Sequence, residues 1–212
     1  MRNYRVYTSE SIIKSRGGEC LLVRGDITEE DMCKEVVNQC VERFGTVDIL
    51  INNAAVQYPQ YDICDITKEQ LLKTFKTNIF SAFYLSKAVI PYMKLGSSII
   101  NTTSIVAYRG NEKLIDYSST KGALTSFTRS LALNLADKGI RVNAVAPGPV
   151  WTPLIVSSFS AQDVKKFAEN REFFRVAQPV EIVEPYVFLA SQAGSYTTGT
   201  TIHVDGGKIA NT

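Results

Sequence analysis

The chain has few of the residues that most often mark a hydrolytic or metal-dependent site. It contains one histidine, His203, and no Gly-x-Ser-x-Gly turn. His203 falls in a predicted terminal strand, where a structural role is expected, and a Ser-His-Asp hydrolase is therefore disfavoured. The sequence also lacks the clustered His, Cys, Asp and Glu residues of a zinc site. We expect no catalytic metal.

Strong charge and long apolar runs are missing as well. The formal net charge is +2, and the basic residues are scattered along the chain, so neither a nucleic acid nor a membrane is an expected partner. No apolar run is long enough to cross a bilayer, and no apolar core follows the polar start at Met1. The four cysteines show no Cys-x-x-Cys spacing, which favours reduced thiols and a cytoplasmic protein.

The remaining pattern alternates apolar strands with amphipathic helices. Composition is ordinary, with 45% hydrophobic residues, and we expect one domain over residues 1–212. The pattern predicts an α/β fold with a doubly wound parallel sheet, Rossmann-like in its layout. Strands are expected at 20–24, 47–52, 98–103, 140–146 and 200–205, and helices at 29–44, 68–93, 114–137 and 180–191.

Several polar or turn-forming residues fall where predicted strands end. They are Asp26, Asn53, Ser104 and the pair Pro147 and Gly148. In an open parallel sheet the ligand crevice lies outside the carboxyl ends of the strands. These residues are therefore expected to surround one site.

Ser104, Tyr117 and Lys121 have a spacing that suits hydride transfer assisted by a tyrosine. Tyr117 and Lys121 are four residues apart in a predicted helix and share one face. An ammonium group beside the phenol is expected to lower the tyrosine pKa from about 10. The Ser104 hydroxyl, at a strand end, would hold a substrate carbonyl beside that phenol. A Tyr-x-x-x-Lys match alone is weak evidence, and other motifs are needed.

Those other motifs occur in a fixed order. They are Gly25-Asp-Ile-Thr28, Asn52-Asn-Ala-Ala55, Asn78, Asn101-Thr-Thr-Ser104, Tyr117-Ser-Ser-Thr-Lys121, Pro147-Gly-Pro-Val-Trp-Thr152 and Val204-Asp-Gly-Gly207. Together they resemble the short-chain dehydrogenase/reductase family over nearly the whole chain from about Gly18. The segments around Asn78, 146–155 and 195–199 resemble the glucose/ribitol dehydrogenase-like, general-stress branch.

The resemblance implies an NAD- or NADP-dependent oxidoreductase that interconverts an alcohol (a sugar, polyol or small alcohol) and a carbonyl. It implies a catalytic set of Asn78, Ser104, Tyr117 and Lys121. It also implies cofactor contacts from Asp26, Ile27, Asn53, Tyr117, Lys121, Pro147, Gly148, Val150 and Thr152. Family members assemble through helices corresponding to 68–93 and 114–137, so a homo-oligomer, a dimer or tetramer, is expected. Residues 153–176 are expected to form a lid over the substrate.

Plainer interpretations remain open for most of these residues. Asp26 could be a turn or cap residue, and Asn53 could tie neighbouring strands together. Asn78 could lie on a solvated helix face, because asparagine is unfavourable inside a helix. Ser104 could cap a strand end. Pro147 and Gly148 could simply form the turn that ends a strand.

One family feature is absent from the sequence. No Gly-x-x-x-Gly-x-Gly turn occurs, although this turn normally supplies backbone N–H groups to the cofactor pyrophosphate. We therefore expect an N-terminally truncated sheet, with residues 1–10 either a strand remnant or an unstructured leader. We also expect an open apolar edge on strand 47–52 and weak cofactor binding. The alternatives are a catalytically silent binding or oligomerisation module, or an unrelated function on the same scaffold.

Overall fold

The computed structural model describes residues 2–163, 169 and 173–207. The longer elements are α1 (Arg2–Ser15), α2 (Glu30–Phe44), β1 (Ile49–Asn52), α3 (Lys68–Phe75), α4 (Ser81–Val89), β2 (Ser98–Thr102), α5 (Val106–Arg109), α6 (Ile115–Asn134), β3 (Arg141–Pro147), α7 (Pro153–Ser158), α9 (Val183–Ala190) and β4 (Thr201–Val204). A π-helical turn, Lys76–Phe80, joins α3 to α4. Short 3₁₀ turns cover Ile63–Asp65, Ile90–Tyr92, Pro179–Ile182 and Gln192–Gly194.

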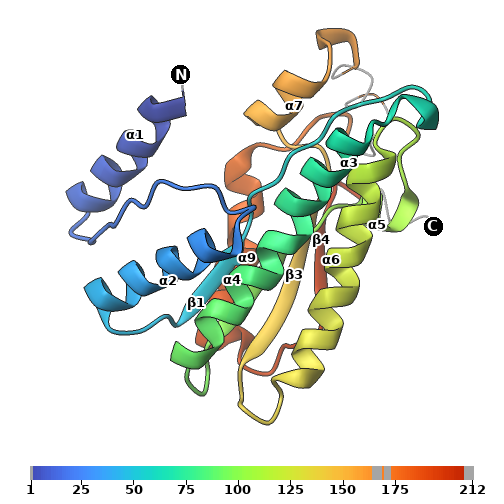
Figure 1. The fold of residues 1–212 in the computed structure, drawn as a ribbon. Helices are drawn as coiled ribbons and strands as arrows, with labels where there is room; N and C mark the ends of the chain where they lie inside the picture. Colours follow the sequence, from blue (N-terminus) through green and yellow to red (C-terminus); the bar gives the residue numbers. More distant parts are fainter. Residues whose placement is uncertain (1, 164–168, 170–172, 208–212) are drawn as a thin grey trace.

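The four strands form one parallel sheet in the order β1-β2-β3-β4. Ser98 pairs with Ile49 on one side and with Arg141 on the other. Helices α4 and α6 cover one face of the sheet, and α9 lies behind it on the other face (Figure 1). The predicted α/β fold with a parallel, doubly wound sheet is confirmed.

The central strands β2 and β3 bury apolar side chains on both faces of the sheet. Ile99, Ile100, Val142 and Val145 are fully buried, because a parallel sheet with helices on both faces offers no solvated side. Ile99 and Val142 pack towards α2 and α4, whereas Ile100 and Val145 pack towards α9. Alternate residues of each strand thus pack against the helices on opposite faces of the sheet.

The N-terminal part of the chain departs from the sequence-based expectations. Residues 20–24 form no strand; a strand needs a neighbour to pair with, and β1 pairs only with β2 among the described residues. The start of the chain is neither a strand remnant nor an unstructured leader, because helix α1 runs from Arg2 to Ser15. Helix α2 begins after Glu29, whose side chain makes no capping bond.

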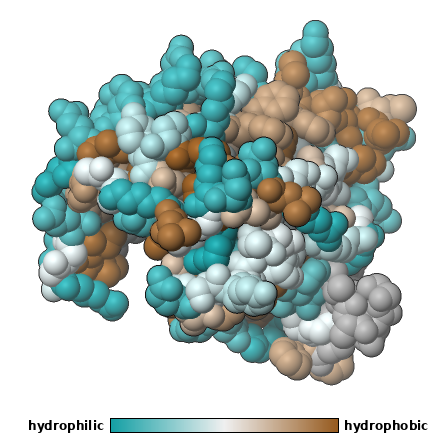
Figure 2. Space-filling model, turned by 90° about the horizontal axis from the view of Figure 1, so that it is seen from below, coloured by the Kyte–Doolittle hydropathy of each residue, from teal (hydrophilic) through white to brown (hydrophobic). Residues whose placement is uncertain are grey.

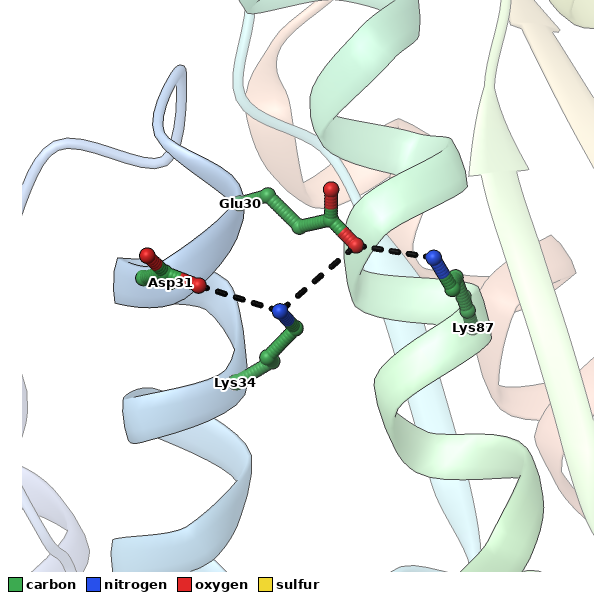
Figure 3. Close-up of polar contacts among 4 residues, drawn as sticks. All are labelled: Glu30, Asp31, Lys34 and Lys87. Carbon is green, nitrogen blue, oxygen red and sulfur yellow. Dashed lines mark hydrogen bonds and ion pairs between the residues drawn. The ribbon is translucent and has the colours of Figure 1, made fainter.

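Helix α2 is held against α4 mainly by buried apolar groups. Cys33 and Val37 face inwards from α2. At the surface, Glu30 accepts from Lys87 of α4 at 2.9 Å, and Lys34 lies 3.0 Å from Asp31 (Figure 3). Exposed ion pairs are screened by water and contribute little. Burial of the apolar face is therefore the main source of this contact.

Apolar side chains also remain on the surface. On the edge strand β1, Ile49 and Ile51 are 45% and 46% exposed. Seen from below, apolar patches interrupt the polar surface (Figure 2). An unpaired apolar strand edge readily accepts another chain. No helix in the described part of the chain is both long and apolar enough to span a membrane.

Candidate active site

A cavity of about 780 Å³ opens at the carboxyl end of the sheet. Its walls come from the ends of β1, β2 and β3, from α5 and α6, and from the segment that includes α7. Eight of the predicted site residues line it: Asn53, Ser104, Tyr117, Lys121, Pro147, Gly148, Val150 and Thr152. Of the residues expected at strand ends, Asn53, Ser104, Pro147 and Gly148 therefore surround one cavity, whereas Asp26 does not.

Tyr117 enters the cavity from the first turns of α6. Its side chain is 8% exposed, and its backbone N–H donates to Asp116 at 2.8 Å. Asp116 is itself fixed by Thr74, which donates at 2.8 Å from α3. The start of α6 is thus held in place by a buried carboxylate.

The electrostatics of Tyr117 differ from the expectation. Burial raises the pKa of Tyr117 to about 12, and a hydrogen bond with Ser104 opposes this only in part. The expected net lowering of the Tyr117 pKa beside Lys121 is wrong. The loss of solvation outweighs any stabilisation of the phenolate. Tyr117 is therefore a protonated phenol at neutral pH.

Lys121 lies one turn further along α6, on the same face as Tyr117. Its Nζ is 5.5 Å from the centre of the Tyr117 ring and donates to the backbone carbonyl of Thr102 at 2.6 Å. The residue is 2% exposed, and burial lowers the pKa of Lys121 to about 8. The predicted helix geometry of the Tyr117 and Lys121 pair is thus observed.

Asn78 sits in the π turn rather than in a regular helix. Its Oδ1 accepts from the Val56 N–H at 2.8 Å, and its Nδ2 donates to the Val56 carbonyl at 2.9 Å and to Thr120 Oγ1 at 3.1 Å. At 2% exposed, it does not lie on a solvated face, so that alternative is wrong. Asn78 does not line the cavity; it ties the loop after β1 to the helix that carries Tyr117.

Asp26 and Ile27 are not brought to the cavity. Asp26 Oδ1 accepts from the Thr28 N–H at 3.0 Å, and this bond lowers the pKa of Asp26. The geometry is the turn that the plainer interpretation of Asp26 described. No strand leads into this turn, so the expected placement of Asp26 at a strand end is wrong.

Gly148 has a structural reason to be glycine. A Cβ at this position would come within 3.0 Å of the Asp205 backbone. The Gly148 N–H also donates to the Val204 carbonyl at 2.9 Å, which extends the contact between β3 and β4. The pair Pro147 and Gly148 thus closes the strand and turns the chain along the cavity wall towards Val150.

Thr102 and Tyr186 are among the cavity residues that the sequence did not predict. Thr102 Oγ1 lies 2.7 Å from the Tyr186 hydroxyl and donates to Asn53 Oδ1 at 2.9 Å. Thr102 is part of the motif that ends in Ser104, and strand alternation could have flagged it. Tyr186 carries no such signal, because α9 reaches the cavity only through the packing of the fold.

The charges around the cavity have one sign. Among its described lining residues, Arg109 and Lys121 are cationic and no carboxylate is present. No group of three or more potential metal ligands occurs in residues 2–163, 169 and 173–207. The lining therefore suits a ligand with negative charge.

Comparison with known proteins adds a consistent result. Residues 5–208 match the family model described as "Enoyl-(Acyl carrier protein) reductase". General stress protein 39 of Bacillus subtilis is 53% identical over 200 residues, covering 94% of this chain and 70% of that protein. The chloroplastic NADPH-dependent aldehyde reductase 1 of Arabidopsis thaliana is 50% identical over 194 residues, covering 91% of this chain and 67% of that protein.

One solved structure has a similar fold. It is a short-chain dehydrogenase/reductase, titled glucose/ribitol dehydrogenase, from Brucella melitensis. It superposes with a TM-score of 0.82 at 34% identity, covering 87% of this chain and 74% of that chain. The predicted resemblance, including its branch, is confirmed.

Proposed function

Because this chain belongs to the short-chain dehydrogenase/reductase family, we propose that it is an NAD- or NADP-dependent oxidoreductase that interconverts an alcohol and a carbonyl. One observation carries the proposal: Ser104, Tyr117 and Lys121 line a single cavity in which no carboxylate is present among the described lining residues. The substrate class is a sugar, polyol or small alcohol. The names of the similar proteins, an aldehyde reductase and a glucose/ribitol dehydrogenase, support this class.

The cofactor is NAD or NADP, and when bound it supplies or accepts the hydride. We assign Lys121, which lies beside Tyr117, to the nicotinamide ribose, and Arg109 supplies positive charge for the phosphates. We assign further contacts to Asn53, the strand end at Pro147 and Gly148, and the wall residues Val150 and Thr152. Asp26 and Ile27 lie outside the cavity, so their proposed contact with the adenine end requires the nucleotide to extend beyond it.

Tyr117 moves the proton. Its high pKa makes it an acid at neutral pH, so in carbonyl reduction the carbonyl carbon gains the hydride and the oxygen takes the phenol proton. Oxidation of the alcohol runs the same transfers backwards and needs the phenolate. Ser104, which hydrogen bonds with Tyr117, orients the oxygen of the substrate. Lys121 supplies the positive charge that favours the phenolate, and Asn78 holds the two supporting segments together.

The same chain is proposed to form a homo-oligomer, a dimer or tetramer. Phe83 on α4 is 51% exposed and packs against Phe127 of α6 with tilted rings, whose centroids are 4.2 Å apart. The exposed Phe83 on α4 and the partly buried Phe127 on α6 form an aromatic surface that a second copy can cover. All four cysteines are free, which supports a reducing, cytoplasmic location.

The function is tested by Tyr117→Phe, which keeps the ring and removes the phenol. We expect kcat to fall about 10²–10⁴-fold, with nucleotide affinity nearly unchanged. Turnover is followed through the absorbance of the reduced nicotinamide over a panel of aldehydes, sugars and polyols. Tyr196→Phe is the matched control, because Tyr196 is fully exposed.

Two outcomes would contradict the proposal. A Tyr117→Phe variant that keeps more than about a tenth of kcat would remove Tyr117 as the acid, given the usual size of this catalysis. A wild-type chain that binds no nucleotide and turns over nothing in the panel would favour the alternative, a catalytically silent binding or oligomerisation module.

A further inference from the structure

Thr102 connects three residues at the cavity wall. Its Oγ1 lies 2.7 Å from the Tyr186 hydroxyl and 2.9 Å from Asn53 Oδ1. Its backbone carbonyl accepts from Lys121 Nζ at 2.6 Å. The ends of β1 and β2, helix α6 and helix α9 therefore meet in one set of hydrogen bonds, and all four residues line the cavity.

The direction of these bonds follows from counting hydrogens. Thr102 Oγ1 has one hydrogen, and a carboxamide oxygen can only accept. That hydrogen is donated to Asn53 Oδ1, so the Tyr186 hydroxyl is the donor in its bond to Thr102. The Asn53 Nδ2 then points away from Thr102 with both of its hydrogens available. No described residue accepts a hydrogen bond from this amide nitrogen.

Tyr186 is well placed to hold this arrangement. It packs on the apolar cluster formed by Ile100, Val145, Ile182 and Leu189, between the sheet and α9. Burial raises the pKa of Tyr186, so its hydroxyl remains a donor at neutral pH. Asn53, by contrast, is exposed to the cavity. The fixed hydroxyl of Tyr186 thus orders the exposed side chain of Asn53.

We propose that Tyr186 is a positioning residue, which orients the Asn53 carboxamide through Thr102 so that its Nδ2 donates to a hydroxyl-bearing ligand. Successive hydrogen bonds of this kind polarise one another, so the outer donor is strengthened as well as oriented. The identity of the ligand, the nucleotide, rests on the proposed function. The ordering of Asn53 does not rest on it.

Three substitutions separate the parts of this network. Tyr186→Phe removes only the phenol oxygen. Thr102→Val keeps the shape of the residue and removes the hydroxyl, whereas Thr102→Ser keeps the hydroxyl and should rescue the network. Tyr196→Phe, at a fully exposed tyrosine, is the matched control. Nucleotide affinity is measured by calorimetry, and the side-chain amide resonances of Asn53 are followed by NMR in isotope-labelled protein.

We expect Tyr186→Phe and Thr102→Val each to weaken nucleotide binding about three- to tenfold, the usual effect of one neutral hydrogen bond. Thr102→Ser and Tyr196→Phe should bind as the wild type does. In the free protein, both disruptive variants should move the Asn53 amide resonances towards those of a solvated side chain.

The double variant distinguishes positioning from a separate role. If Tyr186 acts through Thr102, adding Tyr186→Phe to Thr102→Val causes no further loss of affinity or shift of the Asn53 resonances. Additive losses would overturn the proposal, as would Asn53 resonances that do not respond to Tyr186→Phe. The resonances need no ligand, so they decide the matter even if no nucleotide binds, an outcome that would count against the proposed function alone.

Discussion

Lys121 should make the stability of this protein depend on alkaline pH in a way that one substitution removes. Its side chain is 2% exposed, and burial lowers its pKa from 10.5 to about 8. Below pH 8 the amine is protonated in both the folded and the unfolded chain. Between about pH 8 and 10.5 the unfolded chain binds the proton and the folded chain does not. The free energy of unfolding therefore rises with pH in this window.

The size of the effect follows from the two pKa values. At about 1.4 kcal/mol for each tenfold change in proton concentration, Lys121 contributes a rise of about 3 kcal/mol between pH 7 and pH 10.5. Lys121→Met keeps the length of the side chain and removes the titration. The bond lost at the Thr102 carbonyl affects the variant equally at every pH. The free energy of unfolding of the variant minus that of the wild type should therefore be highest at pH 7 and fall as the pH rises.

The assay is urea unfolding followed by circular dichroism at several pH values from 7 to 10.5. Lys138→Met is the matched control, because Lys138 is exposed on the surface, and its difference from the wild type should not vary over this range. The prediction is refuted if the free energy of unfolding of Lys121→Met also differs from that of the wild type by a constant amount at every pH. The same variant should lose both nucleotide affinity and turnover, which would show that the buried charge is kept for function at a cost in stability.

Two further changes test the supporting structure. Asn78→Leu leaves the part-buried N–H and carbonyl of Val56 without their partner and should lower the free energy of unfolding by about 2–4 kcal/mol. Asn134→Leu, at an exposed helix position, is the control, and a loss below about 1 kcal/mol would count against the role of Asn78. Phe83→Glu places a charge on the apolar surface of α4 and should reduce the oligomeric state seen by light scattering. A wild-type chain that is already a stable monomer at micromolar concentration would remove the assembly claim.

Local patterns in the sequence predicted the sheet and part of the geometry of the candidate site. Apolar runs without alternation located β2 and β3, and the spacing of four residues placed Tyr117 and Lys121 on one face of α6. The ends of these strands then located the cavity. Such features depend on periods of two and 3.6 residues, which neighbouring residues alone determine.

The features that the sequence did not predict depend on the surroundings. Residues 20–24 have the composition of a strand but no strand to pair with. The pKa of Tyr117 depends on how deeply the ring is buried, and its cost outweighs the nearby ammonium. Tyr186 reaches Thr102 across 84 positions of sequence. Packing between distant segments decides each of these outcomes, and a single sequence shows no local sign of it.

A π turn at Lys76–Phe80 interrupts the helical segment from Lys68 to Val89. Such a turn contains one residue more than an α-helical turn. Deleting one residue here would restore regular turns and rotate α3 relative to α4 by about 100°. Either the contact of Thr74 with Asp116 or the packing of α4 on the sheet would then be lost. This segment is thus constrained in its length as well as in its composition, and an insertion or deletion would be more damaging here than most single substitutions.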